Sequence, residues 1–212
     1  MNDSILTNNE AKLIGTVSSA LKFSHKLFEE EFYTFVLNVP RLSDTTDCLN
    51  ITVSERLLCY TPLHEGNEVC VLGQFRSYNN YSGVGSKLVL TLFARDIKPV
   101  DDETDKSNPN SVYLNGYLCK KPIYRTTPFG REISDILLAV NRAFGKSDYI
   151  PCIAWGRNAK YASTMDVGSN LKVWGRIQSR EYQKHFETGD VVNKTAFEVS
   201  VNKLESAKDA EG

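Results

Sequence analysis

The sequence repeats itself at an offset of about 101 residues, and this repeat constrains the fold more than any other feature. The apolar segment 35–39 corresponds to 136–140, and, one residue later in register, 68–73 corresponds to 170–175. Single residues that correspond are Gly15 and Gly116, Arg41 and Arg142, Asp47 and Asp148, and Gly73 and Gly175. Because the offset changes so little along the chain, we expect two copies of one unit, each of roughly 90 residues and large enough for its own core.

Composition divides the chain at the same place. We expect a first domain over 11–100, a linker over 101–110 and a second domain over 111–205, because the linker is acidic, contains a proline and has no aliphatic or aromatic residue. Residues 111–204 carry 14 Lys/Arg against 8 Asp/Glu, a balance of +6, whereas residues 11–100 carry 9 of each. The positive second domain points to a polyanionic partner, although ordinary solvated lysines would give the same balance.

Apolar and β-branched runs of strand length dominate both copies. In the second copy they predict strands near 112–119, 131–142, 148–155, 170–181 and 192–204, with one helix near 157–165. The first copy shows the same order, with a helical turn at 55–60. A helix between the third and fourth of five strands is the plan of the OB-fold. We therefore predict an all-β chain with short helices, forming two tandem five-stranded OB-fold barrels whose strands bend at Gly116 and Gly175.

Nothing in the sequence predicts catalysis or a cofactor. The three histidines lie far apart, no phosphate-binding loop ends in Gly-Lys-Ser/Thr, and the short Gly83-Val-Gly85 segment indicates only a hairpin turn. The five cysteines include no Cys-x-x-Cys pair, which is typical of free thiols in a reducing cytoplasm. No apolar run is long enough for a membrane span, and the first residues do not resemble a secretion signal. We expect a non-enzymatic, cytoplasmic protein without metal or cofactor.

Aromatic and basic residues alternate in three clusters of the second copy, namely 142–149, 155–157 and 176–186. Single-stranded nucleic acid needs this mixture, because rings stack on bases and Lys or Arg neutralise phosphates. Core packing is the competing explanation for any single ring. The clusters favour nucleic-acid binding over packing, and they require no readout of base sequence.

Five segments of the second copy resemble the bacterial single-stranded-DNA-binding protein family, in order and with the right spacing. They are Leu114-Asn-Gly116, Lys121-Pro-Ile-Tyr-Arg125-Thr-Thr-Pro-Phe-Gly130, Ala139-Val-Asn-Arg142, Tyr149-Ile-Pro-Cys-Ile-Ala-Trp155-Gly-Arg157-Asn-Ala-Lys160, and Val167-Gly-Ser-Asn-Leu-Lys-Val-Trp-Gly175-Arg176-Ile-Gln-Ser-Arg180-Glu-Tyr182. The resemblance covers essentially all of 111–204. It implies an OB-fold that binds single-stranded DNA in replication, repair or recombination, with no strong sequence preference.

Carried over position by position, the resemblance implies base stacking and phosphate contacts by named residues. The stacking positions correspond to Phe144, Tyr149, Trp155 and Tyr182, and the phosphate contacts to Arg125, Arg142, Arg157 and Arg180. Trp174 alternates with apolar neighbours, so it faces away from the core as a stacking platform or as part of an interface. The expected nucleic-acid-binding residues are Phe144, Tyr149, Trp155, Trp174, Tyr182, Arg125, Arg142, Lys146, Arg157, Arg176, Arg180 and Lys184.

The first copy departs from this pattern. Ser43, Cys48 and Ser54 stand at the positions of Phe144, Tyr149 and Trp155, so we expect weak DNA binding there, or a role as interface or spacer. Family members with one barrel commonly form tetramers, so two barrels per chain imply a homodimer. An OB-fold protein-interaction module, of the primosomal accessory type, and an RNA-binding protein remain alternatives.

Overall fold

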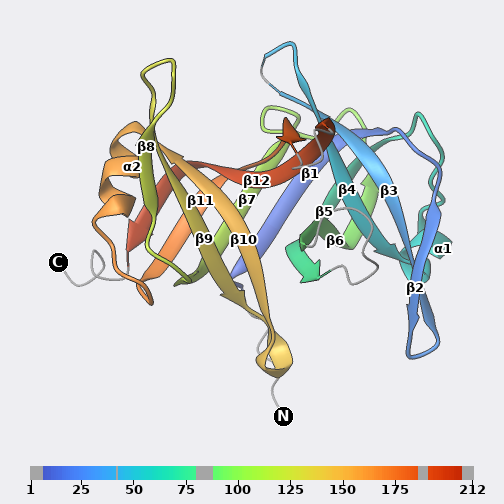
Figure 1. The fold of residues 1–212 in the computed structure, drawn as a ribbon. Coiled ribbons are helices and arrows are strands. Elements are labelled where there is room, and N and C mark those ends of the chain that lie inside the picture. The colour runs from blue at the N-terminus through green and yellow to red at the C-terminus, as the bar shows by residue number, and fades with distance from the viewer. Residues whose placement is uncertain (1–6, 42, 80–87, 186–190, 207–212) are drawn as a thin grey trace.

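Two closed β-barrels joined side by side make up the computed structural model of this chain (Figure 1), which describes residues 7–41, 43–79, 88–185 and 191–206. Among these residues, no helix is long and apolar enough to cross a membrane. The predicted Gly83-Val-Gly85 turn lies outside the described residues.

The first barrel contains β1 (Asn9–Val17), β2 (Lys22–Leu27), β3 (Glu30–Pro40), β4 (Thr46–Ser54), β5 (Glu68–Asn79) and β6 (Leu88–Pro99), with α1 (Glu55–Tyr60) between β4 and β5. The second contains β7 (Asn110–Leu118), β8 (Ile123–Thr126), β9 (Glu132–Asn141), β10 (Ser147–Trp155), β11 (Asn170–His185) and β12 (Val191–Ser206). A 3-10 turn, η1 (Ala143–Gly145), precedes β10, and α2 (Gly156–Ser163) follows it. The OB-fold prediction is thus confirmed, with the helix between the expected strands.

Each barrel closes through its first strand. In the first barrel β1 pairs with both β3 and β5, and in the second β7 pairs with both β9 and β11. Side chains on alternate positions fill the interiors, including the fully buried Leu13, Leu37, Leu114, Leu138 and Ile150. The short strands β2 and β8, which the sequence pattern did not predict, pair with β3 and β9 as hairpin arms outside the five-stranded rings.

The two barrels share a continuous sheet, because β1 pairs antiparallel with β7 from Asn9 opposite Leu114 to Leu13 opposite Asn110. The predicted linker is packed against the first barrel rather than free. Lys106 pairs with Glu68 at 2.9 Å, and the Ile14 N–H donates to the Pro109 carbonyl at 2.7 Å. The barrels therefore form one body with a shared outer surface.

Two of the repeated glycines mark where the barrels bend. The pairing register of β5 and β6 shifts at Gly73, and that of β11 and β12 shifts at Gly175. A Cβ atom at Gly73 would collide with the Phe93 carbonyl oxygen, and one at Gly175 with the Ser200 carbonyl oxygen. Glycine is required here because the strands approach each other too closely for a side chain. Of the two positions predicted from the sequence, Gly175 is one; at the other, Gly116, a Cβ atom would collide with the Ala139 carbonyl oxygen, so glycine is required there as well.

Candidate nucleic-acid interface

The outward side of the second barrel is a curved sheet surface formed by β8, β9, β10, β12 and β11 in that order. Strand β10 shows which side chains face outward, because its alternate residues Ile150, Cys152 and Ala154 are buried in the core. The alternate residues Tyr149 and Trp155 therefore point outward, and Tyr149 is 49% exposed. We call this surface the outer face of the second barrel.

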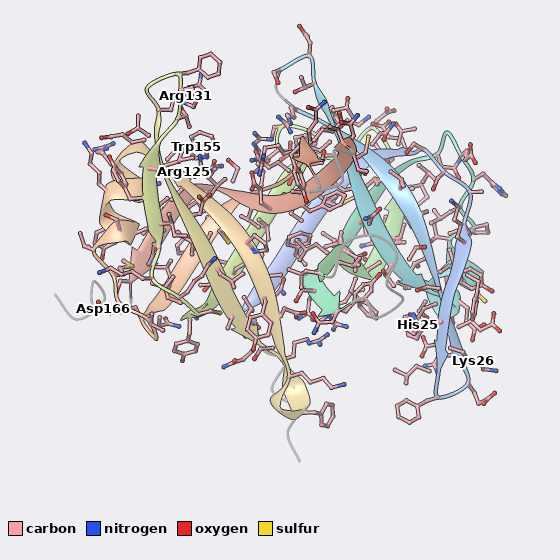
Figure 2. The ribbon with its side chains drawn as sticks, viewed as in Figure 1. His25, Lys26, Arg125, Arg131, Trp155 and Asp166 are labelled. Carbon is pink, nitrogen blue, oxygen red and sulfur yellow. The ribbon has the colours of Figure 1, made fainter. Side chains whose placement is uncertain are left out.

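Trp155 and Arg125 are neighbours on this outer face. Both lie opposite Ile133 of β9, Trp155 from β10 and Arg125 from β8, and Figure 2 shows them close together beside β8. The Trp155 Nε1–H donates to the Ser200 Oγ at 3.1 Å, which fixes the indole while leaving it partly exposed. Arg125 Nε lies 2.8 Å from Asp135 Oδ2, an exposed ion pair that a phosphate can displace at little cost.

Strand β11 contributes the other end of the outer face. Tyr182 is 37% exposed, and the Arg180 guanidinium lies 5.8 Å from the centre of its ring. Arg180 also has Glu198 of β12 at 3.8 Å, but its side chain is 57% exposed. A ring with a loosely held cation beside it suits a stacked base and its phosphate. Lys184 lies in the same strand, and its side chain is outside the described part of the structure.

Other predicted residues flank the outer face. Phe144 and Lys146 belong to the turn between β9 and β10, where Phe144 adopts a positive φ of 61° and is 93% exposed. Arg157 is the second residue of α2, two positions after Trp155, and lines a surface hollow with it. These three side chains extend the face at two of its borders.

Trp174 lies on a different side of the molecule. It precedes the bulge at Gly175, and its ring packs against Tyr113 with centroids 5.1 Å apart, while Lys203 Nζ lies 4.7 Å from the ring centre. Together with residues of β1 and β5 it lines a hollow that spans the two barrels. The structure therefore does not bring Trp174 to the outer face, and of the two roles predicted for it the interface fits this position.

Arg142 and Arg176 are held at the junction of the barrels. Arg142 Nε lies 3.4 Å from Asp148, and Arg176 Nη1 lies 3.4 Å from Asp47, both buried carboxylates. Burial lowers the pKa of Arg176, and the charge of Arg41 lowers it further. Each guanidinium thus has a structural partner, which the sequence pattern did not indicate.

Phe129 and Arg131 are exposed residues that sequence reasoning left out. They lie at the tip of the hairpin between β8 and β9, next to Gly130 with its φ of 75°, and Phe129 is 92% exposed. The sequence did contain a signal for them, because a glycine flanked by an aromatic residue and an arginine, between two strands, is typical of an exposed hairpin tip.

Among the described residues, no group of three or more His, Cys, Asp or Glu side chains is placed to hold a metal ion. All five cysteines are free. The exposed rings on the outer face can bind a partner by stacking, and the exposed cations can bind it by charge.

Two OB-fold barrels, one of them with exposed rings and cations on its outer face, define the class of tandem OB-fold proteins with a candidate nucleic-acid surface. A sequence model of the single-strand binding protein family matches residues 109–207. Over 110 residues the chain is 37% identical to single-stranded DNA-binding protein 2 of Listeria innocua, covering 49% of this chain and 69% of that protein. The chain therefore belongs to the single-strand binding protein family.

Two further comparisons bear on the extent of the likeness. The chain is 41% identical over 81 residues to single-stranded DNA-binding protein 1 of Staphylococcus aureus, covering 35% of this chain and 48% of that protein. The crystal structure of the wild-type single-stranded DNA binding protein from Thermus aquaticus superposes with a TM-score of 0.74 at 21% identity, covering 93% of this chain and 92% of that one. This last likeness shows that the fold of the whole chain, including the first barrel, is shared.

Proposed function

We propose that this protein binds single-stranded DNA without strong sequence preference, during replication, repair or recombination of DNA. The observation that carries the proposal is the common placement of Tyr149, Trp155 and Tyr182 on the outer face of the second barrel, with Arg125 and Arg180 beside them. The proposed action is binding, with no chemical step.

The mechanism follows from the composition of this face. Every base has a π-face, so an exposed ring can stack on any base, which contributes about 1–3 kcal/mol per base. Each phosphate neutralised by Arg or Lys releases condensed counterions, so binding weakens as salt rises. Neither contribution reads base edges, which accounts for the lack of sequence preference.

The cations divide into two groups. Arg125, Lys146, Arg157 and Arg180 are exposed, and we assign phosphate contacts to them. Arg142 and Arg176 are half-buried and paired with Asp148 and Asp47, so their first role is structural. The Arg176–Asp47 pair joins the two barrels, and the Arg142–Asp148 pair lies within the second barrel beside the junction. Any phosphate contact by these two uses the part of the guanidinium that faces solvent.

We also propose a cytoplasmic homodimer with four barrels. The side of the molecule around β1 and β7 is the candidate interface, because Trp174, Tyr113 and the 38% exposed Leu72 lie there around a common hollow. Lys12 and Glu10 on β1 give the same surface both charges, which suits contact with a second copy. Five free thiols are compatible with a reducing cytoplasm.

The test is a titration with dT and rU oligonucleotides at two salt concentrations, monitored by tryptophan fluorescence. We expect quenching by dT that weakens as salt rises. Stronger binding to rU would favour the RNA-binding alternative. No quenching by either strand would favour the protein-interaction module and overturn the proposal. Light scattering on the same samples measures the assembly, for which a monomer at all concentrations contradicts the homodimer.

A further inference from the structure

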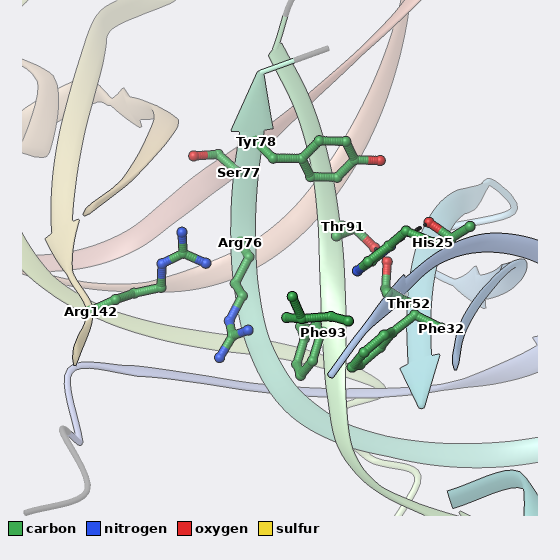
Figure 3. Close-up of a pocket in the computed structure, with 11 residues that line it drawn as sticks. His25, Phe32, Thr52, Arg76, Ser77, Tyr78, Thr91, Phe93 and Arg142 are labelled. Atoms are coloured by element: carbon green, nitrogen blue, oxygen red, sulfur yellow. Dashed lines mark hydrogen bonds between the residues drawn. The ribbon is translucent and has the colours of Figure 1, made fainter. Parts of the chain in front are cut away.

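A cleft of about 520 Å³ opens on the first barrel, on the side that corresponds to the outer face of the second (Figure 3). It lies over β4, β5 and β6, beneath the hairpin arm of β2. The volume falls in the range of small-molecule and nucleotide sites. Neither the repeat nor the family motifs pointed to it, since the first copy lacks the aromatic residues at the matched positions.

Aromatic rings form a connected row along this cleft. The His25 ring stacks on Phe32 with centroids 4.8 Å apart and planes 7° from parallel. Phe32 in turn lies 5.7 Å from Phe93, and the Arg76 guanidinium covers the Phe93 ring at 4.0 Å. His25 is exposed and Phe93 is partly exposed, so both rings can be reached from solvent.

The first barrel therefore has a stacking ring on a different strand from the second. Thr52 of β4 pairs with Phe93 of β6, just as Ile153 of β10 pairs with Ser200 of β12. In the second barrel the ring is Trp155, whose indole reaches over to Ser200. In the first barrel the β4 position is Ser54, and the ring stands on β6 at the position of Ser200. Comparison of aligned positions alone misses this exchange between neighbouring strands.

Positive charge lies at the end of the cleft nearest the second barrel. Arg76 and Arg142 both line it, Arg142 from the second barrel, and none of the described lining residues is Asp or Glu. Among the described residues, Arg76 hydrogen-bonds to the Gln74 amide oxygen at 2.7 Å rather than to a carboxylate. Burial, together with the charge of Arg142, lowers the pKa of Arg76 to about 10, although the buried Asp148 acts in the opposite direction. Asp148 is one carboxylate between two guanidinium groups, so a further anion on their solvent side complements the remaining charge.

The cleft is also continuous with the outer face of the second barrel. Ser77, which lines the cleft, accepts a hydrogen bond from the Tyr149 N–H at 2.7 Å. Tyr149 belongs to the outer face, so a strand lying over Tyr149 reaches Arg142 and Arg76 without leaving the surface.

We propose that this cleft binds an unpaired nucleotide of the same strand, with its base against His25 and Phe93 and its phosphate on Arg76 and Arg142. The proposal rests on the proposed function of the second barrel and extends it. The first barrel is then a second binding site with its own chemistry, and Arg142 is the crossing point between the two.

The first test is photocrosslinking of the full chain to dT strands of about 30 nucleotides that carry one 5-iodouracil at successive positions, followed by peptide mass spectrometry. We expect crosslinks to the peptides that contain His25 or Phe93, in addition to those that contain Trp155 or Tyr182. Crosslinks confined to the second barrel would overturn the cleft and leave the proposed function intact. Failure of the unmodified protein to bind any strand would overturn both.

The second test compares variants of matched chemistry. Phe93→Leu keeps an apolar side chain but removes the ring, and Arg76→Gln removes the charge; each should weaken binding of the same strand about 5- to 150-fold. Tyr60→Leu and Arg56→Gln are the controls, since both side chains are exposed in the same barrel but do not line the cleft. Arg76→Gln should also lower the slope of log affinity against log salt by about 0.7, which lost folding alone would not do. Unchanged affinity and slope in folded Arg76→Gln and Phe93→Leu, verified by urea unfolding, would contradict the proposal.

Discussion

Asp47 and Asp148 occupy matched positions in the two barrels, and each accepts a hydrogen bond from the main-chain N–H of a serine in the opposite barrel. Ser179 donates to Asp47 at 2.8 Å, and Ser77 donates to Asp148 at 2.7 Å. Both carboxylates are fully buried. The repeat therefore creates a reciprocal pair of hydrogen bonds across the junction, which we call the clasp, in addition to the pairing of β1 with β7.

The two halves of this clasp are unequal. Asp47 receives two hydrogen bonds from Arg41, at 2.6 and 2.8 Å, and has Arg176 Nη1 at 3.4 Å, whereas within the described ranges the ion pair of Asp148 is with Arg142 Nε alone, at 3.4 Å. Burial alone would raise the pKa of Asp47, but the bonds from Arg41 and Ser179 hold it below the ordinary value. Burial dominates at Asp148 and raises its pKa. The charge of Asp47 is thus well stabilised and that of Asp148 is not.

Removing the charge should therefore cost more at Asp47 than at Asp148. Asp47→Asn leaves the Arg41 guanidinium without its carboxylate, and we expect a loss of about 3 kcal/mol in the free energy of unfolding. Asp148→Asn keeps an acceptor for the Ser77 N–H and removes a poorly compensated charge, so its cost should be about 1 kcal/mol or less. Urea unfolding at pH 7 measures both. Equal losses in the two variants would contradict the asymmetry.

The same asymmetry predicts how stability responds to acid. The lowered pKa of Asp47 gives stability that is present above its ordinary value of 3.8 and is lost as the pH falls through the folded-state value. The raised pKa of Asp148 has the opposite sign, so its contribution is present below 3.8 and is lost as the pH rises through its raised value. Below about pH 4 the Asp47→Asn variant should lose stability less steeply than the unmodified protein. Parallel curves from pH 5 to pH 2 would show that Asp47 is not the group responsible.

The sequence predicted the two barrels but not the hydrogen bonds that Asp47 and Asp148 make across the junction, and this difference has a physical cause. Strand-length apolar runs and the glycines at 73 and 175 report local geometry, so the five strands and the helix of each copy could be predicted. The serine partners of Asp47 and Asp148 come from the other barrel, and the pairing of β1 with β7 joins the two barrels. Long-range contacts of this kind leave no periodic signal along the chain.

The candidate site, too, could be predicted only in part from the sequence. The family resemblance pointed to Tyr149, Trp155, Arg180 and Tyr182, and in the structure these residues lie on one outward side. Trp174 precedes the register shift at Gly175 and packs against Tyr113, away from that side. The role of Phe93 could not be predicted, because it depends on which strand lies next to β4 in space.

The close approach at Gly175 provides a test of the barrel geometry. In Gly175→Ala the new Cβ would meet the Ser200 carbonyl oxygen, and since backbone must move, we expect a loss of more than about 3 kcal/mol in the free energy of unfolding. Gly168→Ala is the matched control, because Gly168 has a φ of 86° but open space around it, and should cost about 1–2 kcal/mol. Thermal or urea unfolding compares them. A cost at Gly175 no larger than at Gly168 would mean that β11 and β12 do not approach so closely.

Loss of a ring from the outer face should weaken DNA binding directly. Trp155→Ala and Tyr182→Ala should each reduce the free energy of binding to a dT strand by about 1–3 kcal/mol. Trp174→Phe should leave affinity unchanged, because Trp174 packs against Tyr113 on another side of the molecule. In that variant Trp155 is the remaining tryptophan, so its quenching reports the outer face alone. Unmodified affinity in both alanine variants would refute the assignment of this face.

Substitutions at Arg180 and Arg176 should have different effects, one on phosphate binding and the other on stability, although the two residues lie only four positions apart on β11. Arg180 is mostly exposed, with its nearest carboxylate at 3.8 Å, so Arg180→Gln should lower the salt slope of binding by about 0.7 and leave stability nearly unchanged. Arg176 contacts the buried Asp47, so Arg176→Gln should lower stability by about 1 kcal/mol or more. Fluorescence titrations at several salt concentrations, with urea unfolding of the same samples, measure both quantities. A slope change in Arg176→Gln but not in Arg180→Gln would reverse the two roles and move the path of the strand toward the junction of the barrels.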